Sequence, residues 1–342
     1  MNQKNFKYYS IHDILKIKTK IDIQIPKYFL IKEDEVKENF NPDIEITQEN
    51  LSYSRPEERK KRSGAFFYWT ENKALFIDYE IPLLNAKLVI DDLEGKTKIK
   101  FTKAFIKHGN ISQLFETLLS IKLIQKGYAI VHTGCLNHHG DAFLFTALRD
   151  TGKTSTVLSL LDGKELRFMS DDLTIMSKNS EVYSYPTKVN ISPYTLSGNV
   201  ISPSNDLMSR IKKRLANSRF EILFGDILKI AMGDRKEVPR DLIEDKGLIK
   251  KIFVIGGGEN GIRKIDGEEV ARKILINTLE LYNPFRVYSL NFYYHIFDFN
   301  IFDIFDEQKK IVKEAVKDAE CFEIRLNRVE KYPEMIKEII KG

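Results

Sequence analysis

Residues 141–161 read DAFLFTALRDTGKTSTVLSLL, an apolar run, a short polar loop and a second apolar run. The triplet Gly152-Lys153-Thr154 is what a phosphate-binding loop ends with, and it stands where a strand would pass into a helix. In such a loop, backbone N–H groups and the positive end of the helix face the phosphates. The stretch therefore predicts a strand over 142–146, a phosphate loop, and a helix over 151–161.

The first half of the loop departs from the usual pattern G-x-x-x-x-G-K-[ST], because Ala147 stands at the first glycine. If that position needs a positive φ, alanine costs about 1 kcal/mol there. Asp150 adds a carboxylate that would repel phosphate, and the neighbouring Arg149 would offset it. We expect a working loop; the alternative is a degenerate loop that no longer binds nucleotide. The candidate nucleotide-binding residues are consecutive: Ala147, Leu148, Arg149, Asp150, Thr151, Gly152, Lys153, Thr154 and Ser155.

Two carboxylates, Asp171 and Asp172, follow the apolar strand predicted over 166–170. A carboxylate at the end of a strand beside a phosphate loop typically holds Mg²⁺, directly or through water, together with the hydroxyl of the loop, here Thr154. An Asp-Asp pair alone is a common turn, but a phosphate loop 17 residues upstream makes this pair more specific. One carboxylate can serve the metal while the other takes the proton from an attacking hydroxyl.

Histidines stand in the preceding segment. His132 lies in a strand predicted over 128–136, and pairing with 141–147 as a hairpin would bring it beside the strand that feeds the loop. A lone strand histidine is otherwise a satisfied core residue. His138 and His139 occupy the turn of this hairpin, and we interpret them as turn residues because no further metal ligand can be assigned from the sequence.

This order resembles the C-terminal catalytic domain of HPr kinase/phosphorylase, whose nucleotide-binding fold is shared with ATP-type phosphoenolpyruvate carboxykinase. The segments that carry the resemblance are VHTGCL, GDAFLFTALRDTGKTSTVLSLL, LRFMSDDLTIM and SYPTKVNIS, and it extends more weakly to the helix before them and to CFEIRLNR at the C-terminal end. The clear match covers about 128–192. Members of that family often assemble, so a homo-oligomer is an expectation.

The resemblance also implies roles for individual residues. Lys153 and Thr154 would hold the triphosphate and Mg²⁺, and His132 would lie near the transferred phosphoryl group. Asp171 would be the base on the acceptor hydroxyl, and Asp172 a metal ligand. The prediction is an ATP- and Mg²⁺-dependent kinase with His132, Lys153 and Asp171 as catalytic residues and a small metabolite or a protein serine as acceptor.

Two other functions remain open. One is a nucleotide-binding regulatory protein without transfer activity. The other is a nucleic-acid-associated protein that uses the basic stretch 207–251, where twelve Lys/Arg stand against seven Asp/Glu. Acidic residues interleave throughout this stretch, which favours a solvated helical face over nucleic acid binding.

The predicted fold class is α/β, leaning towards α+β: an HPr-kinase-like P-loop nucleotide-binding core of mixed sheet with flanking helices, preceded by a β-rich N-terminal region. Residues 1–110 are rich in β-branched and aromatic residues, and 111–342 would form the nucleotide-binding domain. Helical spacing predicts helices over 111–127, 267–283 and 306–318, and a strand and helix close the chain.

Other signals have structural explanations. GGGENG (256–261) fits G-x-G-x-x-G, but Asn260-Gly261 favours a hairpin over 250–266. The aromatic run 286–305 predicts core or interface, and Arg325 after a strand could meet an anion or be a surface residue. No apolar run in the 342 residues reaches the ~18 residues that a membrane span needs, and the N-terminus lacks the apolar core of a signal peptide. Cys135 and Cys321 fit a reducing compartment. We therefore expect a cytoplasmic protein.

Overall fold

A computed structural model of the protein describes these ranges of the chain: 6–57, 60–81, 83–108, 111–148, 151–191, 234–279 and 300–341. The chain divides into two compact units, residues 1–128 with 282–308, and residues 129–281 with 309–342. Both contain strands and helices, so the predicted mixed α/β class with a strand-rich N-terminal region is confirmed. None of the described helices has the length and apolar character needed to cross a membrane.

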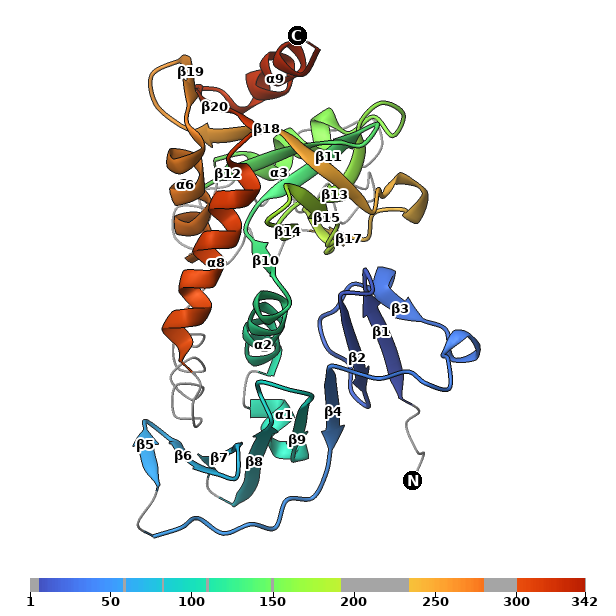
Figure 1. The fold of residues 1–342 in the computed structure, drawn as a ribbon, viewed down its shortest axis with the longest axis vertical. Helices are drawn as coiled ribbons and strands as arrows, with labels where there is room; N and C mark the ends of the chain where they lie inside the picture. The colour runs from blue at the N-terminus through green and yellow to red at the C-terminus, as the bar shows by residue number, and fades with distance from the viewer. Residues whose placement is uncertain are drawn as a thin grey trace, which may run out of the picture. The chain divides into compact units, whose positions relative to one another are not determined.

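The sheet of the first unit has the strand order β3-β1-β2-β4-β9-β8-β7-β6-β5 (Figure 1). Its strands are β1 (Lys7–Ile11), β2 (Leu15–Thr19), β3 (Leu30–Ile31), β4 (Ile44–Gln48), β5 (Lys61–Ser63), β6 (Phe66–Glu71), β7 (Ala74–Ile81), β8 (Leu84–Asp91) and β9 (Thr97–Phe101). β4 is parallel to β2 and β9, and the other pairs are antiparallel. Asn72 and Lys73 join β6 to β7 with φ of 49° and 63°, the positive values that a tight hairpin turn requires.

Two helices follow this sheet, α1 (Lys103–His108) and α2 (Ile111–Gln125). α2 confirms the helix predicted over 111–127, and the chain leaves it through Gly127, which has a φ of 84°. The buried Lys122 on α2 donates hydrogen bonds to the carbonyl oxygens of Leu93 and Gly95, at 2.5 and 2.6 Å. α2 therefore belongs to the first unit, and the boundary predicted between residues 110 and 111 falls inside that unit.

The sheet of the second unit has the order β10-β14-β15-β18-β12-β11-β13, and β20 pairs with both β18 and β19. The strands are β10 (Tyr128–Val131), β11 (Gly134–His138), β12 (Asp141–Ala147), β13 (Arg167–Ser170), β14 (Thr174–Ser177), β15 (Glu181–Tyr183), β18 (Lys246–Gly256), β19 (Gly261–Ile265) and β20 (Glu320–Arg325). β16 (Val189–Ile191) and β17 (Asp234–Lys236) form a separate pair. Short 3₁₀ helices are η1 (Lys27–Phe29), η2 (Glu33–Glu35), η3 (Arg240–Leu242) and η4 (Val329–Lys331).

Three parallel strands, β12, β18 and β20, form the centre of this unit. Their register aligns Phe145, Phe253 and Phe322, whose rings stack with centroids 5.4 and 5.9 Å apart. The same register places Ala147 beside Ile255, so the three strands end at one edge of the sheet. In α/β sheets, ligands bind at this carboxyl edge.

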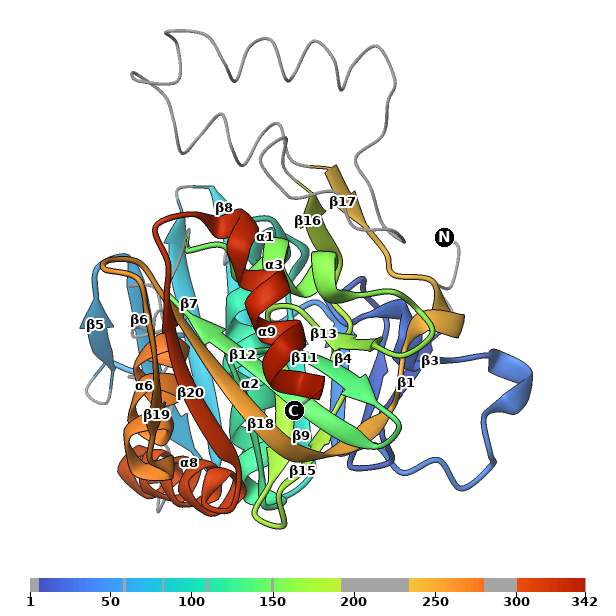
Figure 2. The same ribbon diagram turned by 90° about the horizontal axis from the view of Figure 1, so that it is seen from above.

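Three helices lie within the second unit: α3 (Lys153–Leu160), α6 (Gly267–Leu279) and α9 (Tyr332–Lys341). A fourth, α8 (Ile301–Val316), begins in the first unit and continues into the second. Gly134, the partner of Phe145, comes so close to α3 that a Cβ there would lie 2.9 Å from Val157. Thr146, which follows Phe145 on β12, points to the opposite face of the sheet and accepts a hydrogen bond from Asn277 on α6. α3 and α6 therefore cover opposite faces of the sheet, and α9 lies beside α3 (Figure 2).

Three predictions need correction. The strand predicted over 128–136 breaks at residues 132–133: its first half pairs with β14, and only its second half forms the β11–β12 hairpin. The hairpin predicted over 250–266 is wrong, because β20 inserts between β18 and β19. The described part of the basic stretch, 234–251, contains strands and η3 rather than the predicted helical face. The rest of that stretch, and most of the aromatic run 286–305, lie outside the described residues.

Candidate functional site

The predicted phosphate loop connects the end of β12 to the start of α3. Ala147 is the last residue of β12 and is buried, and an extended backbone there requires no glycine. Ala147 therefore has none of the backbone strain that a positive φ would cause at this position. Leu148 is exposed, and Thr151 Oγ1 donates to the Leu148 carbonyl at 2.7 Å, which tightens the loop. Arg149 and Asp150 lie outside the described residues.

Gly152 immediately precedes α3 and is the position of the loop where glycine is required. Its φ is 94°, in the left-handed region that favours glycine. A Cβ at this position would lie 2.5 Å from Val329 Cγ1, on η4. The carbonyl of Gly152 accepts a hydrogen bond from Thr156 Oγ1 at 2.9 Å, which fixes the first turn of the helix. The first N–H groups of that turn have no partner within the helix and point out of its start.

Lys153 and Thr154 meet the two aspartates that follow β13. The Lys153 ammonium is buried, donates to the Asp171 carbonyl, and lies 3.2 Å from Asp172 Oδ1. Thr154 Oγ1 donates to Asp171 Oδ2 at 2.9 Å. Ser155, the last predicted loop residue, is half-buried on α3. The structure therefore brings the loop and the aspartate pair together, across the 17 residues that separate Thr154 from Asp171.

The two carboxylates have different surroundings. Asp171 is 1% exposed, and burial raises its pKa to about 6 although the Lys153 ammonium opposes this. The side chain of Asp172 is half exposed. Its pKa is lowered, because Lys153 and His132 outweigh the desolvation. Adjacent acids with pKa values pushed apart are typical of sites where each has its own task.

His132 lies at the break between β10 and β11, and two residues of α6 hold it there. Its backbone N–H donates to Thr278 Oγ1 at 3.1 Å, and its Nδ1 lies 3.3 Å from the Asn277 carbonyl. A carbonyl can only accept, so Nδ1 is the donor. This orientation turns Nε2 towards Asp172 Oδ1, 3.8 Å away. Asn277 is itself fixed by its 2.8 Å bond to Thr146 Oγ1 on β12.

No sequence pattern points to Asn277 and Thr278. They lie about 145 residues beyond His132 in a helix, where an Asn-Thr pair carries no motif. Thr133 was missed as well. Its carbonyl accepts a hydrogen bond from Thr174 Oγ1 at 2.9 Å, which ties the strand break to the turn that carries the aspartates. The three residues act through main-chain contacts that no spacing rule would find.

The oxygen donors at this site suit Mg²⁺. Asp171 Oδ1 is buried and, within the described ranges, has no hydrogen-bond partner. A buried carboxylate oxygen left unpaired costs free energy, which a cation would recover. Together with the Thr154 hydroxyl beside it, this carboxylate offers the hard oxygen ligands that Mg²⁺ prefers. Asp171 and Thr154 would hold the ion.

Other candidates fall outside this cluster. Arg325 ends β20 at the same carboxyl edge of the sheet, but its guanidinium lies 3.2 Å from Glu323 Oε2. GGGENG is followed by β19 rather than by a helix, so it lacks the context of a dinucleotide site. His138 and His139 lie at the opposite end of the β11–β12 hairpin.

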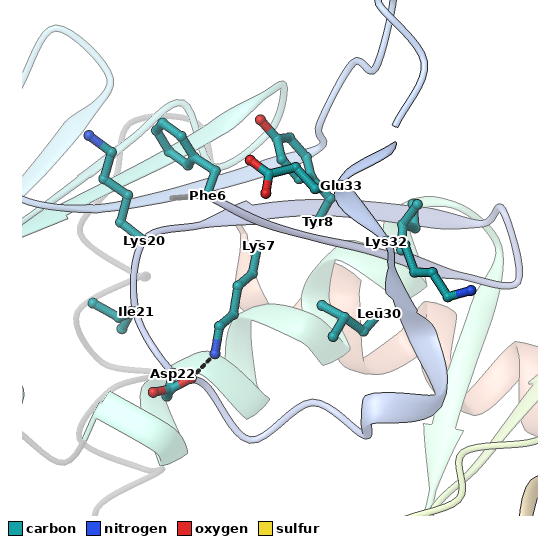
Figure 3. A pocket seen from close by; sticks show the side chains of 10 residues that line it. Phe6, Lys7, Tyr8, Lys20, Ile21, Asp22, Leu30, Lys32 and Glu33 are labelled. Atoms are coloured by element: carbon teal, nitrogen blue, oxygen red, sulfur yellow. Dashed lines mark hydrogen bonds and ion pairs between the residues drawn. The ribbon is translucent and has the colours of Figure 1, made fainter. Parts of the chain in front are cut away.

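A pocket of about 440 Å³ lies in the first unit, around β1 and β3 (Figure 3). Lys20 stands 4.6 Å from the centre of the Phe6 ring, and Lys7 pairs with Asp22. Its walls combine apolar side chains with positively charged lysines and negatively charged acids.

A scan against protein-family models and a search of curated proteins find no match for this chain. Function is therefore inferred from the residues themselves and from how the fold arranges them.

Proposed function

We propose that this protein is a kinase that transfers the γ-phosphoryl group of ATP to a hydroxyl acceptor, with Mg²⁺ as cofactor. The observation that carries the proposal is the meeting of five side chains from three separate segments: His132, the pair Lys153 and Thr154, and the pair Asp171 and Asp172. Ammonium, hydroxyl, imidazole and two acids at the start of a helix are what phosphoryl transfer needs.

In this proposal, binding of the phosphates depends on the start of α3. The N–H groups that follow Gly152 donate to phosphate oxygens, and the Lys153 ammonium neutralises their charge. Thr154 and Asp171 contribute to the metal site, and the bound Mg²⁺ would offset charge on the β- and γ-phosphate oxygens. Phosphoryl transfer requires little covalent chemistry from the protein, so positioning and charge neutralisation supply most of the catalysis.

The base is Asp172 in our proposal, the reverse of the division that the resemblance implies. Asp171 is buried against Thr154, where an acceptor hydroxyl has no access. Asp172 is half exposed, and its lowered pKa keeps the carboxylate ionised at neutral pH. His132, held by α6, places its Nε2 3.8 Å from that carboxylate. A base must lie within reach of the proton that it removes, which favours the more accessible acid.

Two isosteric substitutions test the proposal. Lys153→Met should reduce transfer by at least about 100-fold and weaken ATP binding, because phosphate charge is left unneutralised. Asp172→Asn should reduce transfer by roughly 10²–10⁴-fold while ATP still binds, because only the base is lost. Lys164→Met and Asp141→Asn, at exposed positions of the same unit, are the matched controls.

The assay incubates the protein with labelled ATP, Mg²⁺ and a broad pool of metabolites and proteins, and identifies phosphorylated products by mass. Product formation that persists unchanged in both site variants would refute the proposal. Loss of transfer in all four variants would point to a folding defect, which circular dichroism of each variant checks.

A second candidate function is nucleotide-dependent regulation without transfer. It is favoured by Asp150, whose carboxylate stands in the loop sequence, and by the contact between Lys153 and both aspartates, which a phosphate must displace. Titration calorimetry with ATP and GTP separates the two: tight binding with no product on any acceptor supports regulation.

A further inference from the structure

The turn between β11 and β12 presents two histidines side by side. His139 and Gly140 both have positive φ, 53° and 100°, and the turn closes on the pair formed by His138 and Asp141. This is the geometry of a two-residue hairpin turn. Asn137 Oδ1 accepts from the Gly140 N–H at 2.9 Å, which fixes the turn. The imidazoles of His138 and His139 lie with ring centres 4.6 Å apart.

A carboxylate from another segment meets these rings. Glu165 lies in the loop before β13, and this loop is shaped by Asp162, whose Oδ1 accepts the backbone N–H groups of residues 164, 165 and 166 at 2.9–3.0 Å. Glu165 Oε2 is 3.0 Å from His138 Nε2 and 3.4 Å from His139 Nε2. Both segments are therefore held in place by bonds that do not involve the three side chains themselves.

These distances match a metal site. Two imidazole nitrogens and one carboxylate oxygen lie within 4.8 Å of one another. Ligand atoms at bonds of about 2.0–2.1 Å in a tetrahedral arrangement stand roughly 3.3–3.5 Å apart, and the observed separations need only small rotations of exposed side chains to reach this. The side chains of His138, His139 and Glu165 are 36%, 71% and 66% exposed, respectively, so water can complete the coordination.

We propose that His138, His139 and Glu165 bind a divalent transition-metal ion of the Zn²⁺ class. Two imidazoles with one carboxylate suit Zn²⁺, Ni²⁺ or Cu²⁺, whereas Mg²⁺ and Ca²⁺ prefer oxygen ligands alone. The carboxylate favours a cation at this place, and the adjacent imidazoles supply the nitrogen ligands. A bound ion joins the β11–β12 turn to the loop that leads into β13.

This site is separate from the proposed phosphoryl-transfer site. His138 pairs with the first residue of β12, and the phosphate loop follows the seventh, Ala147, so the two sites lie about 20 Å apart along the strand. Zn²⁺ at the turn therefore contributes no ligand or charge to the γ-phosphate. Its effect is on the stability of the hairpin and of β13.

The test measures Zn²⁺ binding to the full chain by competition with a chromogenic zinc indicator, in excess Mg²⁺. The wild type should bind one ion at this site, and Zn²⁺ should raise the temperature of unfolding. His139→Asn and Glu165→Gln should each weaken binding at least about 10-fold and abolish the thermal shift. Glu259→Gln, at an exposed loop position of the same unit, is the matched control and should bind as the wild type does.

Affinity unchanged in both ligand variants would overturn the proposal, because the ion would then be bound elsewhere, for example at His132 and Asp172. Absence of Zn²⁺ binding to the wild type would overturn it as well. All the substituted residues are exposed, so the fold should be retained, and unfolding in urea without metal checks this directly.

Discussion

Gly152→Ala tests whether the start of α3 is built around glycine. A Cβ at residue 152 would lie 2.5, 3.1 and 3.4 Å from Cγ1, Cγ2 and Cβ of Val329. Carbon atoms in contact are normally about 3.5–4.0 Å apart, so the closest overlap is about 1 Å. Such overpacking costs about 1–3 kcal/mol, and an alanine at the observed φ of 94° adds about 1–2 kcal/mol. The expected loss in the free energy of unfolding is about 2–5 kcal/mol.

The overlap and the backbone strain can be separated by a second substitution. Val329→Ala removes the two atoms that lie closest to the new Cβ, so the double variant should recover the steric part, about 1–3 kcal/mol, and retain the backbone part. Neighbouring residues that share a contact show this kind of coupling. ATP binding should not recover with it, because in the proposed site the strained backbone carries the N–H groups that would face the phosphates.

The assay is urea unfolding of the four proteins that form the cycle: the wild type, Gly152→Ala, Val329→Ala and the double variant. The chain contains two units, so the transition of the second unit must be followed by a probe within it. Unfolding free energies that are simply additive would show that residues 152 and 329 do not meet, and that the start of α3 is not built around glycine. The same conclusion follows if Gly152→Ala alone leaves stability unchanged.

Three further predictions concern buried groups. Glu323 is buried, but hydrogen bonds from Lys273 and Arg263 outweigh this burial and lower its pKa to about 2. The ionised carboxylate therefore stabilises the fold by about 1–3 kcal/mol above about pH 4.5, and this stabilisation is lost as the pH falls towards 2. Acid unfolding of Glu323→Gln should therefore depend less steeply on pH than that of the wild type. Burial lowers the pKa of Lys122 to about 8, so the native state disfavours the ammonium, and the unfolding free energy should rise between pH 8 and 10.5 in the wild type and not in Lys122→Met. Cys135 and Cys321 are buried with raised pKa values, so a thiol reagent at pH 8 should label them only on unfolding, and rapid labelling of the native protein would contradict their burial.

Much of the fold follows from local patterns. Helical spacing of apolar residues located α2, and the β-rich composition of the N-terminal region matches the sheet that β1–β9 form. The change from β12 to α3 around Gly152-Lys153-Thr154 was also correctly placed. These features depend on residues close in the chain, whose backbone preferences and periodicity are readable one segment at a time.

Other features depended on contacts between distant segments. The Asn260-Gly261 turn is typical of a hairpin, yet β20, more than fifty residues further on, takes the place beside β18. The break at His132 is stabilised from α6, and no apolar pattern marks it. Ala147 needs no glycine because it remains within β12, which only the strand register reveals.

The sequence alone determined the mixed α/β class and the passage from strand to helix around Gly152-Lys153-Thr154, and it singled out the aspartate pair as a candidate partner of that loop. The tertiary structure decided which of those residues meet: Asp171 with Thr154, Asp172 with Lys153 and His132, and Glu165 with the two turn histidines. The reason is physical. Periodicity and turn residues encode the conformation of each segment, whereas strand order and side-chain convergence depend on how all segments bury their apolar surface together.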